Sequence, residues 1–156
     1  MARVRVQEAA FDAGIETAAL TAGRRDVGAV ATFIGFVRDA NEGDAVQGMT
    51  LEHYPGMTEK ALEAICDEAA SRWSVLDLRV VHRVGALSPG DPIVFVGVAS
   101  AHRGEAFAAC EFLMDYLKTR APFWKKERIP GGDRWVEARA SDDEAAARWQ
   151  VDEDRG

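Results

Sequence analysis

Two apolar runs joined by a short turn constrain the fold of this chain more than any other feature. Residues 77–87 (DLRVVHRVGAL) and 92–100 (PIVFVGVAS) are rich in β-branched residues, and the Pro-Gly pair of residues 88–91 (SPGD) is a strong turn signal. We therefore expect a β-hairpin. Apolar residues at helical spacing then follow from about Arg103 to Pro122, where a helix must end. A hairpin that leads into a helix predicts a sheet with packed helices.

The remainder of the chain predicts further strands and helices around this unit. Residues 27–37 (VGAVATFIGFV) are apolar on both faces, which favours a central strand. The other expected strands lie near 4–6, 46–54 and 134–140, and the other expected helices lie over 13–23, from about 55, and over 141–149. Adjacent strands with intervening helices indicate an α+β fold, with helices packed on a mixed, mostly antiparallel sheet.

Length and composition fit one domain. A chain of 156 residues with 47% hydrophobic residues can bury a full core, so we expect a single domain over 1–150 and a flexible acidic tail over 151–156. Cys66 and Cys110 lie on the apolar faces of predicted helices without metal-ligand spacing, and are expected to be buried thiols. The sequence shows no signal-peptide run and no stretch of membrane-spanning length, which predicts a soluble, cytoplasmic protein with no membrane partner.

Positive charge is concentrated in one segment of an acidic chain. The formal net charge is -7 and the pI is about 5.0, which argues against a nucleic-acid partner because proteins that bind nucleic acids carry a broad basic face. Residues 116–128 (YLKTRAPFWKKER) nevertheless hold five cations and one anion. A local positive potential of this kind suits one small anion.

The lysines of this segment form the first candidate site. Lys118 continues the apolar side of its helix, so its ammonium group is expected to be partly desolvated. Pro122 then turns the chain, Phe123 and Trp124 would anchor the corner by burial, and Lys125 returns toward the helix end. Converging ammonium groups need a compensating anion, and their repulsion would lower the pKa of one lysine, as acid/base or nucleophilic catalysis requires. The alternative is that these cations merely complement the helix dipole.

Other cations are expected at the ends of strands. His102 and Arg103 lie where a predicted strand meets a helix, and the backbone N–H groups of a helix start attract anions; a simple capping turn is the alternative. Arg38 ends the long apolar strand before a glycine-containing loop, where binding groups often sit. His82 and Arg83 lie within a strand and are interpreted as structural residues.

Five motifs together resemble one family. The segments FIGFVRD, LEHYPGM, SAHRGEAF, YLKTRAPFWKKE and GDRWVEA, in this order and spacing, are similar to the large, catalytic subunit of molybdopterin synthase, the MoaE family, over about residues 3–150. The resemblance implies an α/β-hammerhead fold and a homodimeric core that carries a small ubiquitin-like sulfur carrier at each end, as a heterotetramer. It implies that cyclic pyranopterin monophosphate gains two sulfur atoms to form the dithiolene of molybdopterin. The sulfur arrives as a thiocarboxylate on the Gly-Gly tail of the carrier, and the transfer needs no metal or cofactor.

The resemblance also implies which side chains form the site. Lys118 and Lys125 match the active-site lysines of the family. The residues that match its substrate-binding and pocket positions are Arg38, His102, Arg103, Phe33, Met114 and Arg139. The family builds its pocket from both protomers, so some residues of one copy are expected to serve the Lys118 of the other, namely His102, Arg103 and Arg139.

Three questions stay open on the sequence. Lys126 doubles the second lysine, so either Lys125 or Lys126 can face the pocket, and Lys126 is counted among the candidate substrate-binding residues. The same basic pocket would also suit a non-catalytic adaptor that binds an anionic peptide terminus or a phosphorylated small molecule. A lysine enzyme that forms a Schiff base through Lys118 is the third interpretation.

Overall fold

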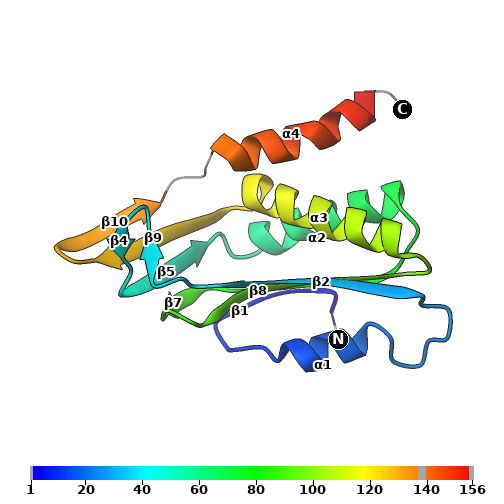
Figure 1. Ribbon diagram of the computed structural model, residues 1–156, viewed down its shortest axis with the longest axis horizontal. Helices are drawn as coiled ribbons and strands as arrows, with labels where there is room; N and C mark the ends of the chain where they lie inside the picture. Colours follow the sequence, from blue (N-terminus) through cyan, green and yellow to red (C-terminus); the bar gives the residue numbers. More distant parts are fainter. Residues whose placement is uncertain (1, 137–139, 155–156) are drawn as a thin grey trace.

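The computed structural model of the chain describes residues 2–136 and 140–154. Its elements in chain order are β1 (Val4–Gln7), α1 (Ala13–Ala19), β2 (Ala29–Phe36), β3 (Ala40–Asn41), β4 (Asp44–Ala45), β5 (Gly48–His53), α2 (Met57–Arg72), β6 (Val75–Arg83), β7 (Gly85–Leu87), β8 (Pro92–Ser100), α3 (Arg103–Arg120), β9 (Phe123–Ile129), β10 (Gly132–Val136) and α4 (Ala140–Asp154). Figure 1 shows α1 on one side of the strands, α2 and α3 on the other, and α4 outside α3.

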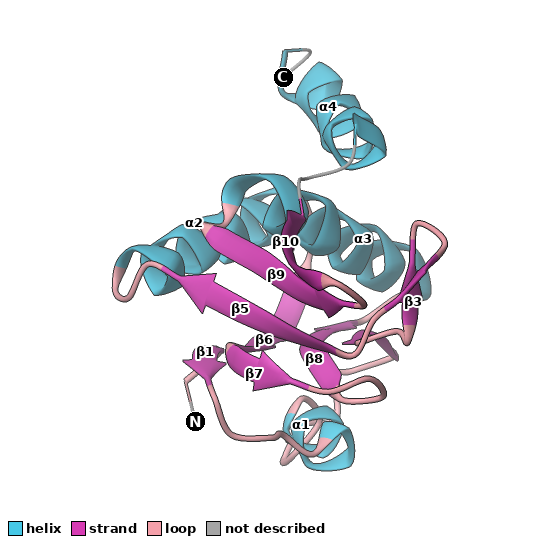
Figure 2. Cartoon of the chain, turned by 90° about the vertical axis from the view of Figure 1, so that its left-hand side faces the viewer, coloured by secondary structure: helices cyan, strands magenta, loops and turns pink. Residues whose placement is uncertain are grey.

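Two four-stranded sheets form the body of the protein. The first has the order β1-β6-β8-β2, and the second, with the order β10-β9-β5-β7, lies at one end of the molecule (Figure 1, Figure 2). The short strands β3 and β4 pair separately. Within the described residues every strand pair is antiparallel except β1 with β6. The prediction of an α+β fold with a mixed, mostly antiparallel sheet is therefore confirmed.

The main core lies between the first sheet and the helices α2 and α3. It joins Leu62 of α2, Val96 of β8 and Phe112 of α3, each almost fully buried. Cys66 and Cys110 belong to the same core and are free thiols, as predicted. Burial raises the pKa of Cys66 to about 12 and that of Cys110 to about 11, so both thiols stay protonated at neutral pH.

The predicted hairpin forms, with an additional bend. β6 pairs with β8 as the two apolar runs predict. Gly85 has a φ of +85°, in the left-handed region that glycine adopts without a steric penalty. The chain turns there, and β7 leaves the first sheet to pair with β5 of the second. One continuous stretch, residues 75–87, thus supplies strands to both sheets and holds them together.

The structure differs from the sequence predictions at three elements. α1 ends at Ala19, four residues early, and the chain then turns through Gly23 with a φ of +72°. β2 is an edge strand within this chain, not a central strand, and leaves Phe36 54% exposed. Residues 123–129, expected as a corner, form β9 between β5 and β10, and Trp124 is 47% exposed instead of buried. Alternation along a strand explains this exposure, because it turns neighbouring aromatic side chains to opposite faces.

The C-terminal helix α4 packs on α3. Trp149 lies edge-on to Trp73 and Phe112 and donates a hydrogen bond to Asp115 at 2.7 Å. The helix runs to Asp154, and the expected division into a domain over 1–150 and a flexible tail stays a prediction. In the described ranges, no helix is both long and apolar enough to cross a membrane.

Candidate functional site

A pocket of about 610 Å³ lies where the two sheets meet, beside the C-terminal end of α3. Strands of both sheets line it: β2, β6 and β8 from the first and β5 and β9 from the second. Its apolar lining includes Leu51, Ile93 and Leu117, which are buried core residues and therefore give the pocket rigid walls. Its size suits a ligand of a few hundred daltons.

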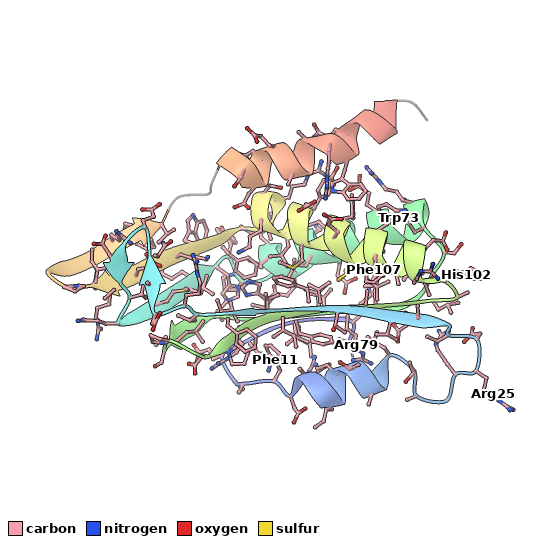
Figure 3. The ribbon with its side chains drawn as sticks, in the orientation of Figure 1. Phe11, Arg25, Trp73, Arg79, His102 and Phe107 are labelled. Atoms are coloured by element: carbon pink, nitrogen blue, oxygen red, sulfur yellow. The ribbon has the colours of Figure 1, made fainter. Side chains whose placement is uncertain are left out.

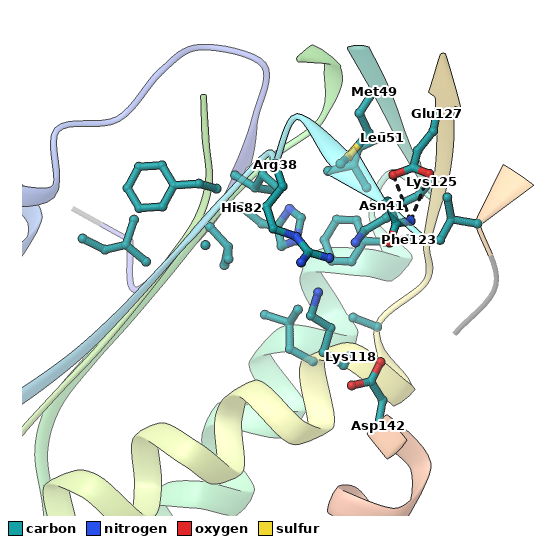
Figure 4. Close-up of a pocket in the computed structure, with 18 of the residues that line it drawn as sticks. Arg38, Asn41, Met49, Leu51, His82, Lys118, Phe123, Lys125, Glu127 and Asp142 are labelled. Atoms are coloured by element: carbon teal, nitrogen blue, oxygen red, sulfur yellow. Dashed lines mark hydrogen bonds between the residues drawn. The ribbon is translucent and has the colours of Figure 1, made fainter. Parts of the chain in front are cut away.

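Lys118 and Arg38 bring positive charge to the pocket from opposite sides. Lys118 stands in the last turn of α3, and Arg38 follows β2; Figure 4 shows both side chains pointing into the same space. Both residues are exposed in the single chain, so the expected partial desolvation of Lys118 is not seen there. Neither forms an ion pair with any residue that the structure describes. The two cations are thus available to an anionic ligand.

The strand β9 decides which of the paired lysines faces the pocket. Alternation places Phe123, Lys125 and Glu127 on the pocket side, and all three line the cavity. Lys126 points to the other face, where its ammonium group lies 3.9 Å from a carboxylate oxygen of Asp133 and 5.4 Å from the ring centre of Trp135. The structure therefore places Lys125 at the pocket and Lys126 outside it.

The remaining predicted residues divide between the pocket and other places. Phe33 lines the pocket from β2. Met114 is half-buried against the main core and is not part of the pocket lining. His102 and Arg103 stand at the start of α3, at the end remote from the pocket, as Figure 3 shows for His102. Fifteen residues of helix separate Arg103 from Lys118, roughly 22 Å at 1.5 Å per residue. Arg139 lies outside the described residues.

Polar groups that the sequence reasoning did not select also line the pocket, among them Glu127 and Asn41. Glu127 is only 4% exposed and accepts hydrogen bonds from Asn41, at 3.0 and 3.2 Å, and from Arg134, at 3.2 Å (Figure 4). Arg134 also pairs with Asp44 at 2.7 Å, which ties β10 to the β3–β4 hairpin. Recognition of β9 as a strand would have found Glu127, because it lies two residues after Lys125.

His82 forms part of the pocket wall, although the sequence suggested a purely structural role. The residue is 5% exposed, and its ring stacks on Phe123 with the ring centres 3.9 Å apart. The pKa of His82 is lowered to about 4. Burial is the largest cause, and the positive charges of Lys118 and Lys125 contribute to the same shift. The ring is therefore neutral at physiological pH.

The charges that line the pocket favour a negatively charged ligand. Arg38, Lys118 and Lys125 face the cavity. Of the two carboxylates in the lining, Glu127 is engaged by Arg134, which leaves Asp142 of α4 as the other negative group. Within the described residues no group of three or more His, Cys, Asp or Glu side chains is arranged to hold a metal ion. The arrangement can bind an anion and stabilise negative charge that develops during a reaction.

Comparison with known sequences gives a consistent result. The sequence model of the family described as MoaE protein matches residues 6–120. The molybdopterin synthase catalytic subunit of Ralstonia nicotianae is 64% identical over 151 residues, which are 97% of this chain and 86% of the relative. The subunit of the same name from Escherichia coli is 65% identical over 126 residues, which are 81% of this chain and 84% of the relative.

Solved structures agree with the sequence comparison. The molybdopterin biosynthesis MoaE protein from Burkholderia ambifaria matches with a TM-score of 0.82 at 57% identity, over 96% of this chain and 99% of that one. The molybdopterin synthase from Staphylococcus aureus matches with a TM-score of 0.82 at 30% identity, over 88% of this chain and 98% of that one. On sequence and structure together, the chain belongs to the MoaE family, with the α/β-hammerhead fold expected of it.

Proposed function

We propose that this chain is the catalytic subunit of a molybdopterin synthase. It transfers two sulfur atoms from the thiocarboxylated C-terminus of a small ubiquitin-like carrier to cyclic pyranopterin monophosphate and so forms the dithiolene of molybdopterin. One observation carries the proposal: Lys118, Lys125 and Arg38 meet in one pocket of a chain that is 64% identical to a molybdopterin synthase catalytic subunit.

The charges of the two reactants explain why such a pocket is needed. The substrate is a phosphate ester and the carrier tail ends in a thiocarboxylate, so two anions must be held together before they react. Three cationic side chains on rigid elements lower this repulsion and orient the tail sulfur toward the pterin side chain. In each transfer the tail sulfur forms a carbon–sulfur bond with the substrate as an oxygen substituent leaves that carbon. Water then attacks the carbonyl carbon of the tail and breaks its carbon–sulfur bond, negative charge develops on the carbonyl oxygen, and the carrier is released as a carboxylate.

The position of each cation suggests its part in the reaction. Lys118 acts closest to the chemistry, where it polarises the carbonyl group of the carrier or moves a proton as sulfur is transferred. Lys125 stabilises the negative charge that develops, and Arg38 holds phosphate or pterin oxygens through its planar fork of donors. Phe33 and the apolar walls limit access of water to the reacting groups.

The cations at the far end of α3 belong to the site of a second copy in this proposal. His102 and Arg103 have no place in the pocket of their own chain, and a homodimer would bring them, with Arg139, to the Lys118 of the neighbour. A carrier at each end of that dimer makes a heterotetramer. We expect the reaction to take place in the cytoplasm, without a nucleic-acid or membrane partner.

A reconstitution tests the function. The purified chain is incubated with a thiocarboxylated carrier and cyclic pyranopterin monophosphate, and dithiolene is measured. Multiple turnovers of dithiolene are expected, together with desulfurised carrier. Binding of both reactants without product would instead identify a non-catalytic adaptor, and trapping of a carbonyl compound on Lys118 by borohydride would identify a Schiff-base enzyme.

A further inference from the structure

His82 is held in a fixed position at the point where the two sheets meet. It is the penultimate residue of β6 in the first sheet, and its ring lies almost parallel to that of Phe123 of β9 in the second, with an interplanar angle of 18°. With 5% of its surface exposed, the side chain has little freedom to rotate. Its exposed part faces the pocket, which it lines.

One hydrogen bond fixes the tautomer of the ring. The Nδ1 atom of His82 lies 2.8 Å from the carbonyl oxygen of Arg83, and a carbonyl oxygen can only accept, so Nδ1 carries the proton. The Nε2 atom of the neutral ring is then an acceptor. Nε2 has no hydrogen-bond partner in residues 2–136 or 140–154, yet it is not among the buried atoms that lack one. The atom therefore opens into the pocket.

The groups around the ring of His82 keep it neutral. Lys118 of α3, Lys125 of β9 and His53 of β5 act electrostatically against its protonation, in addition to burial. The other charged groups of the lining are Arg38, Glu127 and Asp142. Glu127 is engaged by Asn41 and Arg134. A neutral acceptor thus stands among cations that can only donate.

A pterin ring needs such an acceptor. It carries N–H groups as well as the phosphate and carbonyl oxygens that the cations bind, and a buried N–H without a partner costs binding free energy. We propose that His82 is a further substrate-binding residue, whose Nε2 atom accepts a hydrogen bond from a ring N–H group of the pterin. This inference rests on the function proposed above and adds a residue that selects for the heterocycle, where the cations select for its negative charge.

Two variants separate this role from a structural one. His82→Phe keeps a planar ring for the stack on Phe123 but has no acceptor, whereas His82→Gln places a carbonyl oxygen near the position of Nε2. In the reconstituted reaction, His82→Phe should raise the KM for the pterin roughly 3- to 10-fold, the range expected for one neutral hydrogen bond. Its kcat and its affinity for the carrier should stay near those of the wild type, and His82→Gln should restore most of the KM.

Several results would overturn the inference. They are a wild-type KM for the pterin in His82→Phe, an equal rise of this KM in both variants, and a fall of kcat without a change of the KM. If wild-type protein itself forms no dithiolene, the proposed function fails instead, and direct binding of the pterin still measures the contribution of His82.

A substrate-side experiment has its main readout in the wild-type chain. Pterin analogues methylated at single ring nitrogens are bound to the wild-type chain and to His82→Gln. One analogue should bind the wild-type chain roughly 3- to 10-fold more weakly than the unmethylated pterin, and the same analogue should also lose affinity for His82→Gln, whose carbonyl replaces the acceptor. Equal affinity of the wild-type chain for every analogue and for the parent pterin would contradict the inference.

Discussion

The two ends of α3 carry similar charges in different surroundings. At the C-terminal end, Lys118 shares a pocket with Lys125 and Arg38, and both sheets supply its walls. At the N-terminal end, His102 is the N-cap and Arg103 the first residue of the same helix, and neither lines the pocket of its own chain. A cluster of cations in the sequence therefore does not identify a site. A site also needs walls that exclude water, and in the function proposed above a second copy provides them at the start of α3.

Removal of Lys118 should have the largest effect. Lys118→Ala should lower dithiolene formation by at least about 100-fold, as expected when a group that stabilises developing charge is lost, while carrier binding persists. Lys126→Ala is the matched control, because it removes a lysine that faces away from the pocket. Near-normal turnover by Lys118→Ala, or an equal loss of turnover in Lys118→Ala and Lys126→Ala, would contradict a special role for the lysine in the pocket.

Acid should destabilise the pocket end of the protein through His82. Folding lowers the pKa of His82 from 6.5 to about 4, so between these values the unfolded chain binds more protons than the folded chain. This contribution to the free energy of unfolding is fully present above about pH 6.5 and is lost as the pH falls toward 4, at most about 3 kcal/mol. Urea unfolding at pH 7 and at pH 4.5 should show a smaller acid-induced loss in His82→Phe than in the wild type. An equal acid-induced loss of unfolding free energy in the two proteins would contradict the assignment of this pH dependence to His82.

Mixed dimers test whether the far end of α3 completes the pocket of a neighbour. Lys118→Ala and Arg103→Ala should each be nearly inactive alone. When they are unfolded and refolded together, half of the dimers are mixed, and each of these regains one intact site. Total activity should reach about a quarter of the wild-type value in a symmetric dimer. If both residues served the same chain, no mixed dimer would contain an intact site and activity would not return.

The smallest effect should appear in the titration of His82 itself. Lys118→Gln removes one of the positive charges that lower the pKa of His82, so this pKa should rise by a fraction of a unit from about 4. Lys126→Gln, which removes a lysine on the other face of β9 that does not act on His82, should leave it nearly unchanged. NMR titration of the imidazole resonances measures both. A shift of the same size in the two variants would show that the pocket and the outer face of β9 are not electrostatically distinct.

Each strand or helix could be predicted as far as its own residues carry a local sequence signal. The strands of the hairpin and the helices α2 and α3 have strong apolar periodicity, and their positions were predicted within a few residues. β9 was missed because Lys125, Lys126 and Glu127 interrupt any apolar alternation, although pairing with β5 and β10 stabilises the strand. Tertiary pairing therefore overrode a weak local signal.

The candidate site could also be predicted only in part, because some of its residues are brought together by tertiary structure. Charge clustering and position in the sequence selected Lys118, Lys125 and Arg38, and the family resemblance added Phe33; the structure brings all four to one pocket. The choice between the paired lysines needed the register of β9. The position of His82 in the pocket wall was not predicted because alternation was read within one sheet, whereas its neighbour Phe123 comes from the other sheet.

The protonated state of both cysteines has a consequence for a protein that handles activated sulfur. Cys66 and Cys110 are the two cysteines of the chain, and their sulfur atoms lie in the core with the thiol form strongly favoured. A thiolate is the form that attacks sulfur donors, oxidants and alkylating reagents. The enzyme thus presents no cysteine thiolate that could attack the carbonyl carbon of the carrier tail, form a thioester with it and release the sulfur as sulfide.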